Sequence, residues 1–128
     1  MKTSLFNDTI ENIRAAADII RDGGLVAFPT ETVYGLGADA LNSEAVGKVY
    51  AAKGRPSDNP MIVHIADTSE LAKLTDDISG DMRALMDAFW PGPMTMIVRR
   101  KDIVPDVTTG GLDTVGVRLP SSEVARAL

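Results

Sequence analysis

The sequence predicts an α/β domain in which helices pack on a mixed β-sheet. Short apolar runs typical of buried strands alternate with segments in which apolar residues recur at helical spacing. Two predicted strands, 94–98 and 115–119, follow one another with no helix between them, which favours a mixed sheet over an all-parallel one. With 128 residues, 45% of them hydrophobic and 24% charged, the chain has the size and composition of one globular domain, residues 1–128.

The N-terminal part is predicted to form a helix, a strand and a second helix. Asp8 or Thr9 can cap the first helix, which a pair of glycines ends. The apolar run 25–28 is the first strand, and a polar loop follows it. Ser43 is a suitable N-cap for the second helix, which ends near residue 53.

The rest of the chain is predicted to contain three strands and three helices. The run 61–66 has the composition of a strand, and residues 67–70 have the spacing of a capping box that opens a short helix. Ser79 or Asp81 can cap the next helix, which a Pro-Gly-Pro sequence ends. We expect its apolar face to consist of Met82, Leu85, Met86, Phe89 and Trp90. Residues 103–114 are predicted as a loop, and residues 124–128 as the first turns of a last helix.

Composition excludes several classes of function. The net charge is −5, although cations gathered in one cleft can still bind anions. The absence of cysteine excludes disulfides and thiolate metal sites, and it fits a cytoplasmic location. The N-terminus lacks the apolar stretch of a signal peptide, and no apolar run approaches the ~20 residues that span a bilayer. We therefore expect no membrane partner.

Polar residues gather directly after the strand 25–28, in Thr30, Glu31, Thr32 and Tyr34. Two glycines follow, and glycine permits positive φ or close backbone approach. Polar side chains on a glycine-hinged loop at a strand end are typical of small-ligand sites in α/β proteins. The alternative is an ordinary turn with solvated hydroxyl groups.

A second polar cluster, Lys53-Gly54-Arg55-Pro56 with Asn59, follows the second predicted helix. Arginine offers a planar fork that matches phosphate oxygens, and lysine offers a point charge. Two prolines limit the freedom of this loop, so less order must be imposed when a ligand binds. The cluster predicts an anion clamp. For Lys53 the alternative is a favourable contact with the C-terminal end of the helix dipole.

His64 and Arg118 lie on predicted strands. His64, the only histidine, points away from its two apolar neighbours, and such a residue is more often a hydrogen-bonded core residue than a catalyst. One histidine without cysteine argues against a zinc site, and we predict no metal site. Thr114, Gly116 and Arg118 share one face of the last strand, where Arg118 has room to reach a carboxylate or a phosphate. The alternative is a surface arginine on an edge strand.

Other candidate motifs are weaker. Arg99-Arg100-Lys101 could contact nucleic acid, but three charges at a strand end are usually only solvated. The sequence has no P-loop, no G-x-G-x-x-G and no G-x-S-x-G. Glu31 and Asp39 form no evident acid/base pair.

Four segments, taken in order, resemble the YrdC-like family of threonylcarbamoyl-adenylate synthases. They are PTETVYGL (29–36), KGRP with NP (53–60), FWPGPMT (89–95) and VGVRLP (115–120). No single segment is decisive, but together they are highly specific and cover nearly the whole chain from residue 10. The resemblance implies an α/β fold with a twisted mixed sheet and flanking helices around a positively lined cavity.

The resemblance also implies an activity. The family joins L-threonine, bicarbonate or CO2 and ATP into L-threonylcarbamoyl-AMP, releasing pyrophosphate, and a threonylcarbamoyl-transferase complex then modifies adenosine 37 of tRNA. By resemblance, threonine would be bound by Thr32, His64 and Arg118. ATP would be bound by Lys53, Arg55, Asn59 and Thr114. Lys53 and Arg55 would also neutralise the charge on the leaving pyrophosphate. The step needs positioned anions more than acid/base chemistry. Mg²⁺ would be carried by the nucleotide phosphates.

The C-terminal end departs from the family pattern. Family members continue through a Ser-Ala-Asn-type segment that completes the nucleotide pocket, and this sequence stops at Leu128. We therefore expect a C-terminally truncated domain that holds most of the threonine side and part of the ATP side, with little or no synthase activity by itself.

Two other functions compete with this one. A module that binds double-stranded RNA, tRNA or the ribosome without catalysis would need a broad basic face, and a net charge of −5 with one basic triplet argues against it. The related domain of hydrogenase-maturation carbamoyltransferases would come with acylphosphatase and zinc-finger modules, and neither appears in the sequence.

Overall fold

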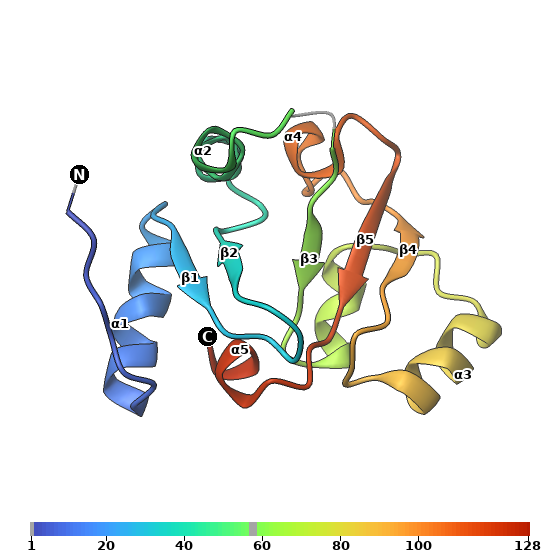
Figure 1. Cartoon of the computed structure of the whole chain (residues 1–128). Coiled ribbons are helices and arrows are strands. Elements are labelled where there is room, and N and C mark those ends of the chain that lie inside the picture. The colour runs from blue at the N-terminus through green and yellow to red at the C-terminus, as the bar shows by residue number, and fades with distance from the viewer. Residues whose placement is uncertain (1, 57–58) are drawn as a thin grey trace.

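The computed structural model describes residues 2–56 and 59–128, which form two small β-sheets surrounded by helices (Figure 1). The elements in chain order are α1 (Ile10–Arg21), β1 (Val26–Phe28), β2 (Gly35–Gly37), α2 (Ser43–Lys53), β3 (Ile62–His64), the 3-10 helix η1 (Thr68–Lys73), α3 (Gly80–Phe89), β4 (Met96–Arg99), α4 (Asp106–Thr109), β5 (Thr114–Arg118) and α5 (Glu123–Ala127). No helix in these ranges is long and apolar enough to cross a membrane.

The larger sheet has the strand order β3-β5-β4. β3 runs parallel to β5, with His64 opposite Arg118, and β4 runs antiparallel to β5, with Arg99 opposite Thr114. The prediction of a mixed sheet is therefore confirmed. The β1-β2 hairpin lies beside β3, with α1 beyond it (Figure 1).

The hairpin contains a strand that the sequence does not signal. Residues 35–37 are predicted as part of a loop, but they form β2, antiparallel to β1. A Cβ atom at Gly37 would lie 2.6 Å from Phe28 Cε1, so only glycine leaves room for this ring against the hairpin. A contact with an aromatic side chain, and not strand propensity, therefore explains β2.

One face of the larger sheet forms the hydrophobic core. Val115 and Val117 of β5 are 2% and 0% exposed, which confirms the predicted alternation along this strand. Met86 of α3 and Trp90, which directly follows α3, belong to the same buried cluster, together with Leu71 of η1. The opposite face of β5 is left for Gly116 and Arg118.

The predicted apolar face of α3 is wrong in part. Met82, Met86 and Trp90 recur every four residues and form a narrow stripe against the core. Leu85 and Phe89 are 43% and 57% exposed, because each precedes a stripe residue by one position, about 100° around the helix. Only this one row of side chains packs against the sheet.

Helix starts agree with the sequence at three sites, those of α1, η1 and α3, and differ at one, that of α2. Thr9 caps α1 and Ser79 caps α3, as predicted. Asn42 caps α2 in place of Ser43, because its side chain accepts the backbone N–H of the third residue that follows, at 3.1 Å. The capping-box segment starts the 3-10 helix η1, and Asp67 is its N-cap.

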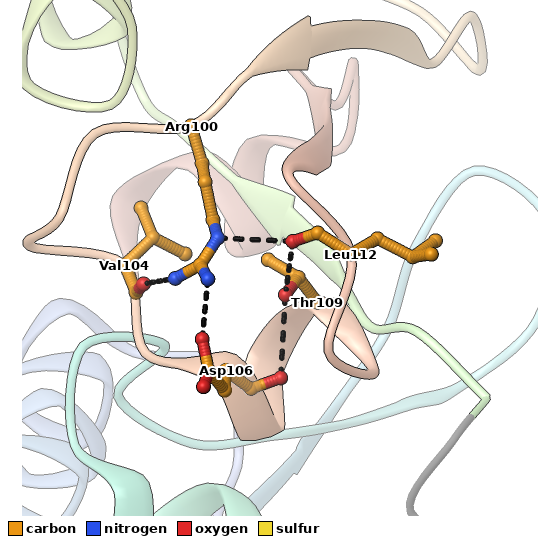
Figure 2. Close-up of polar contacts among 5 residues, drawn as sticks. All are labelled: Arg100, Val104, Asp106, Thr109 and Leu112. Atoms are coloured by element: carbon orange, nitrogen blue, oxygen red, sulfur yellow. Dashed lines mark hydrogen bonds and ion pairs between the residues drawn. The ribbon is translucent and has the colours of Figure 1, made fainter.

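The segment around residues 99–114 departs furthest from the prediction. The expected loop contains the short helix α4. The basic triplet is not simply solvated: Arg100 donates to groups around α4 (Figure 2), and Lys101 Nζ lies 2.9 Å from an Asp76 carboxylate oxygen. Arg99 alone of the three stays exposed.

Truncation of Leu71 tests the core. Its side chain is 1% exposed, and Leu71→Ala should lower the free energy of unfolding by about 2–5 kcal/mol through lost burial and a residual cavity. Urea denaturation measures this loss. Leu5→Ala, at a residue 98% exposed, is the matched control and should change stability by less than about 0.5 kcal/mol. Equal effects of the two substitutions would contradict the assigned core.

Candidate functional site

A cavity of about 800 Å³ lies between the β1-β2 hairpin, α2 and the open face of the larger sheet. This volume falls within the ~300–1,000 Å³ range of small-molecule sites. Its wall comes from segments that are far apart in the sequence, including the loop after β1, the loop after α2, and the ends of β3 and β5. The fold therefore brings the predicted polar clusters together around one space.

The wall of the cavity is rich in cations. Within the part of the chain that the structure describes, the charged lining side chains are the cations Lys53, Lys73, Arg55 and Arg118 and the acids Asp39 and Glu70. The whole chain carries a net charge of −5, so positive charge is concentrated here. Such a cavity favours anionic ligands.

Arg118 and His64 lie next to each other on the cavity wall, because they are register partners on the parallel strands β5 and β3. Thr95 Oγ1 accepts hydrogen bonds from Arg118 Nε at 3.1 Å and from Nη2 at 2.8 Å. These bonds fix the plane of the guanidinium group, which suits it to pair with a carboxylate. Thr95 belongs to the segment 89–95, but its role could not be deduced without the contact.

His64 is hydrogen-bonded, as predicted, but it is exposed on the cavity side and is not a core residue. Its Nδ1 lies 3.2 Å from the carbonyl oxygen of Ile62. A carbonyl oxygen can only accept, so Nδ1 carries the hydrogen and Nε2 of the neutral ring is an acceptor. The Phe28 ring meets the imidazole edge-on, with centroids 6.1 Å apart.

The surroundings of His64 favour its neutral form. Desolvation by the surrounding protein lowers the pKa of His64, the hydrogen bond to the Ile62 carbonyl raises it, the charge of Arg118 lowers it, and Glu31 raises it, in decreasing order of effect. The net result is a pKa below the ordinary value of 6.5. At neutral pH the ring can accept a proton or a hydrogen bond.

The loop after α2 forms the second polar side of the cavity. Gly54 ends α2 with φ +63°, which turns the chain so that Arg55 lies at the wall. The Arg55 guanidinium lies 5.8 Å from the centre of the Tyr50 ring, and Nη2 donates to Asn59 O at 3.3 Å. Arg55 Nε is buried and has no hydrogen-bond partner within residues 2–56 and 59–128, so a ligand oxygen could satisfy it. The sequence did not predict this role of Tyr50, because its position on the apolar face of a helix indicates only packing in the core.

The loop after β1 is organised by Thr30. Its Oγ1 accepts the backbone N–H groups of Thr32 and Val33, both at 3.2 Å, and donates to the carbonyl of Val33. This arrangement holds Thr32 at the cavity wall. Glu31 carries a buried carboxylate oxygen, Oε2, for which the described residues also offer no hydrogen-bond partner.

Thr114 is the exception among the predicted site residues. Thr32, Lys53, Arg55, Asn59, His64 and Arg118 all line the cavity. Thr114 is exposed at the other end of β5, four residues or about 13 Å from Arg118 at the rise of a strand. Its contact with ATP stays a prediction. Across residues 2–56 and 59–128, no three His, Asp or Glu side chains lie close enough to hold a metal ion.

Comparisons with known proteins agree with this geometry. The Sua5/YciO/YrdC family model, described as "Telomere recombination", matches residues 18–128. Threonylcarbamoyl-AMP synthases of Pyrococcus abyssi and Bacillus subtilis are 54% and 53% identical over 116 and 117 residues, each match covering 91% of this chain and 34% of the relative. The crystal structure of P. abyssi Sua5 complexed with L-threonine superimposes with a TM-score of 0.91 at 52% identity, covering 93% of this chain and 35% of that one. The chain thus spans about a third of the length of these relatives.

The charges around His64 can be tested by NMR. Since His64 is the only histidine, its imidazole signals need no assignment, and a pH titration should give a pKa below 6.5. Arg118→Gln removes a nearby positive charge and should raise this pKa, and Glu31→Gln removes a negative charge and should lower it further. A wild-type pKa at or above 6.5, or shifts of the opposite sign, would exclude the geometry described above.

Proposed function

The chain belongs to the Sua5/YciO/YrdC family, and on that premise we propose that it forms the substrate cavity of a threonylcarbamoyl-AMP synthase. The proposed reaction joins L-threonine, bicarbonate or CO2 and ATP into L-threonylcarbamoyl-AMP and releases pyrophosphate. One observation carries the proposal: Arg118 and His64 are neighbours in the same cavity that Lys53 and Arg55 line.

The pair on β3 and β5 supports an amino-acid site. Adjacent strands lie about 4.8 Å apart, a spacing that lets one α-amino acid reach both side chains. Arg118, held by Thr95, would pair with the substrate carboxylate, and Nε2 of His64 would accept a hydrogen bond from its amine or hydroxyl group. Thr32 supplies a further hydroxyl group at the same wall.

The basic side of the cavity supports binding of the nucleotide phosphates. The amine of threonine adds to CO2 to give a carbamate with loss of protons, and a carbamate oxygen then attacks the α-phosphorus of ATP as pyrophosphate leaves. Arg55 and Lys53 would neutralise the negative charge that develops on the leaving group. Mg²⁺ arriving on the phosphates would share this charge. Contacts of Asn59 and Thr114 with ATP belong to the same proposal.

We further propose that the product serves N6-threonylcarbamoylation of adenosine 37 in tRNA, through a cytoplasmic threonylcarbamoyl-transferase complex. The names of the relatives support this context. The engaged side chains of Arg100 and Lys101 leave little of the basic triplet for RNA, which argues against a purely RNA-binding role.

Threonine binding tests the proposal. Isothermal calorimetry of the chain should detect saturable binding of L-threonine, and Arg118→Gln should weaken it roughly tenfold to a hundredfold, since a charged hydrogen-bonded pair contributes ~1.5–3 kcal/mol. Arg83→Gln, an exposed position on α3, is the control and should bind as the wild type does. ATP should strengthen threonine binding.

Two results would overturn the proposal. Equal threonine affinity of wild type and Arg118→Gln would contradict the assignment of Arg118 as the partner of the substrate carboxylate. Absence of threonine binding, together with tRNA binding that weakens steeply with salt, would favour an RNA-binding function.

A further inference from the structure

The helix α4 is too short to be stable by itself. It has four residues, and its N-cap, Pro105, makes no side-chain capping bond. The hydrogen bonds of a single helical turn do not offset the unfavourable free energy of helix nucleation, so contacts with the rest of the protein must stabilise α4. Thr108 and Thr109 are nevertheless 0% exposed. The position of α4 is therefore set from outside the helix.

α4 contacts three segments that build the cavity. Thr108 Oγ1 donates to Ala40 O at 2.6 Å, and Thr108 O accepts the N–H of Met61 at 2.9 Å. The Tyr50 hydroxyl group lies 3.1 Å from Val107 O, which can accept its hydrogen. Ala40 and Met61 line the cavity directly. A displacement of α4 would move all three segments.

Tyr50 extends this contact to the anion clamp. Its hydroxyl group is 2.6 Å from Asn59 O, the carbonyl to which Arg55 Nη2 also donates. The ring of Tyr50 lies under the Arg55 guanidinium. The orientation of Arg55 thus depends on Tyr50 and, through Val107, on α4.

Arg100 joins both ends of α4 (Figure 2). Its Nη1 donates to Val104 O at 2.5 Å, before the helix, and its Nη2 pairs with the carboxylate of Asp106, the first helical residue. Its Nε donates to Leu112 O at 2.9 Å, after the helix. Thr109 Oγ1 lies between Asp106 O and Leu112 O, at 3.2 and 2.9 Å. The Arg100 side chain is 18% exposed and the Asp106 side chain 79% exposed, so the guanidinium group is mostly buried while its ion pair with Asp106 stays open to water.

We propose that Arg100 is a positioning residue for the phosphate side of the cavity. It is not among the residues that line the cavity, and it acts by holding α4, which holds Met61 and, through Tyr50, Arg55. The amino-acid side, Arg118 with Thr95, has no contact with α4 in this network. The inference rests on the proposed function in one respect, because it takes a phosphate group as the ligand of Arg55.

The test compares Arg100→Gln with Arg99→Gln. Both substitutions remove one positive charge from neighbouring positions, but only the first removes the bonds around α4. Three quantities are measured on the full chain: hydrogen exchange of the Met61 amide, which donates to Thr108 O, and, by calorimetry, the affinities for pyrophosphate and for L-threonine.

In Arg100→Gln the Met61 amide should lose most of its protection, and the Kd for pyrophosphate should rise roughly tenfold while that for threonine changes less than about twofold. Arg99→Gln should leave all three unchanged. If Arg100→Gln fails to fold, Arg100→Lys is used, which keeps the charge but not the planar fork. It should also weaken pyrophosphate binding and not threonine binding, by a smaller factor.

Other outcomes have distinct meanings. Unchanged Met61 protection in Arg100→Gln would overturn the proposal, and so would a parallel loss of threonine and pyrophosphate affinity, which indicates general destabilisation. If the wild type does not bind pyrophosphate but Met61 loses protection in Arg100→Gln, the positioning role stands and the proposed phosphate site fails.

Discussion

The structure depends on the central position of β5. This strand pairs with β3 on one side and β4 on the other. Its side chains alternate between the hydrophobic core and the face that carries Arg118. Val115 and Val117 are buried against α3 and η1, which fixes the register of the strand, because a slip by one residue would expose them. The same register places Arg118 beside His64 on the other face. The site is therefore positioned by the packing of the core.

Several elements of this protein are too short to be stable without side-chain contacts from outside the element. β1, β2 and β3 have three residues each, and α4 has four. Elements this short are unstable alone. Gly37 packs closely against Phe28, and α4 is held by a set of hydrogen bonds from the Arg100 guanidinium group. Since the same elements wall the cavity, its shape is sensitive to residues that no ligand touches.

The electrostatics of the cavity differ from those of the whole chain. Cations outnumber acids around the cavity of a protein whose net charge is −5, so an anionic ligand is attracted to this cavity. Arg55 is supported on one side by Tyr50 and carbonyl groups, and no group in the described part of the chain bonds to its buried Nε. A cation held in this way is oriented before a ligand arrives, which lowers the ordering cost of binding.

The sequence by itself determined the fold class, most of the helices, the alternation along β5 and seven candidate site residues, six of which line the cavity. These features depend on local periodicity, capping and short motifs, which the chain carries in its order of residues. Only the tertiary structure decided the strand β2, the helix α4, the exposure of Phe89 and the roles of Thr95, Tyr50 and Arg100. It also separated Thr114 from the cavity. Each of these depends on a particular side-chain contact, on how a helix packs against the sheet, or on the distance along a strand to the cavity, and none of the three is encoded in local pattern.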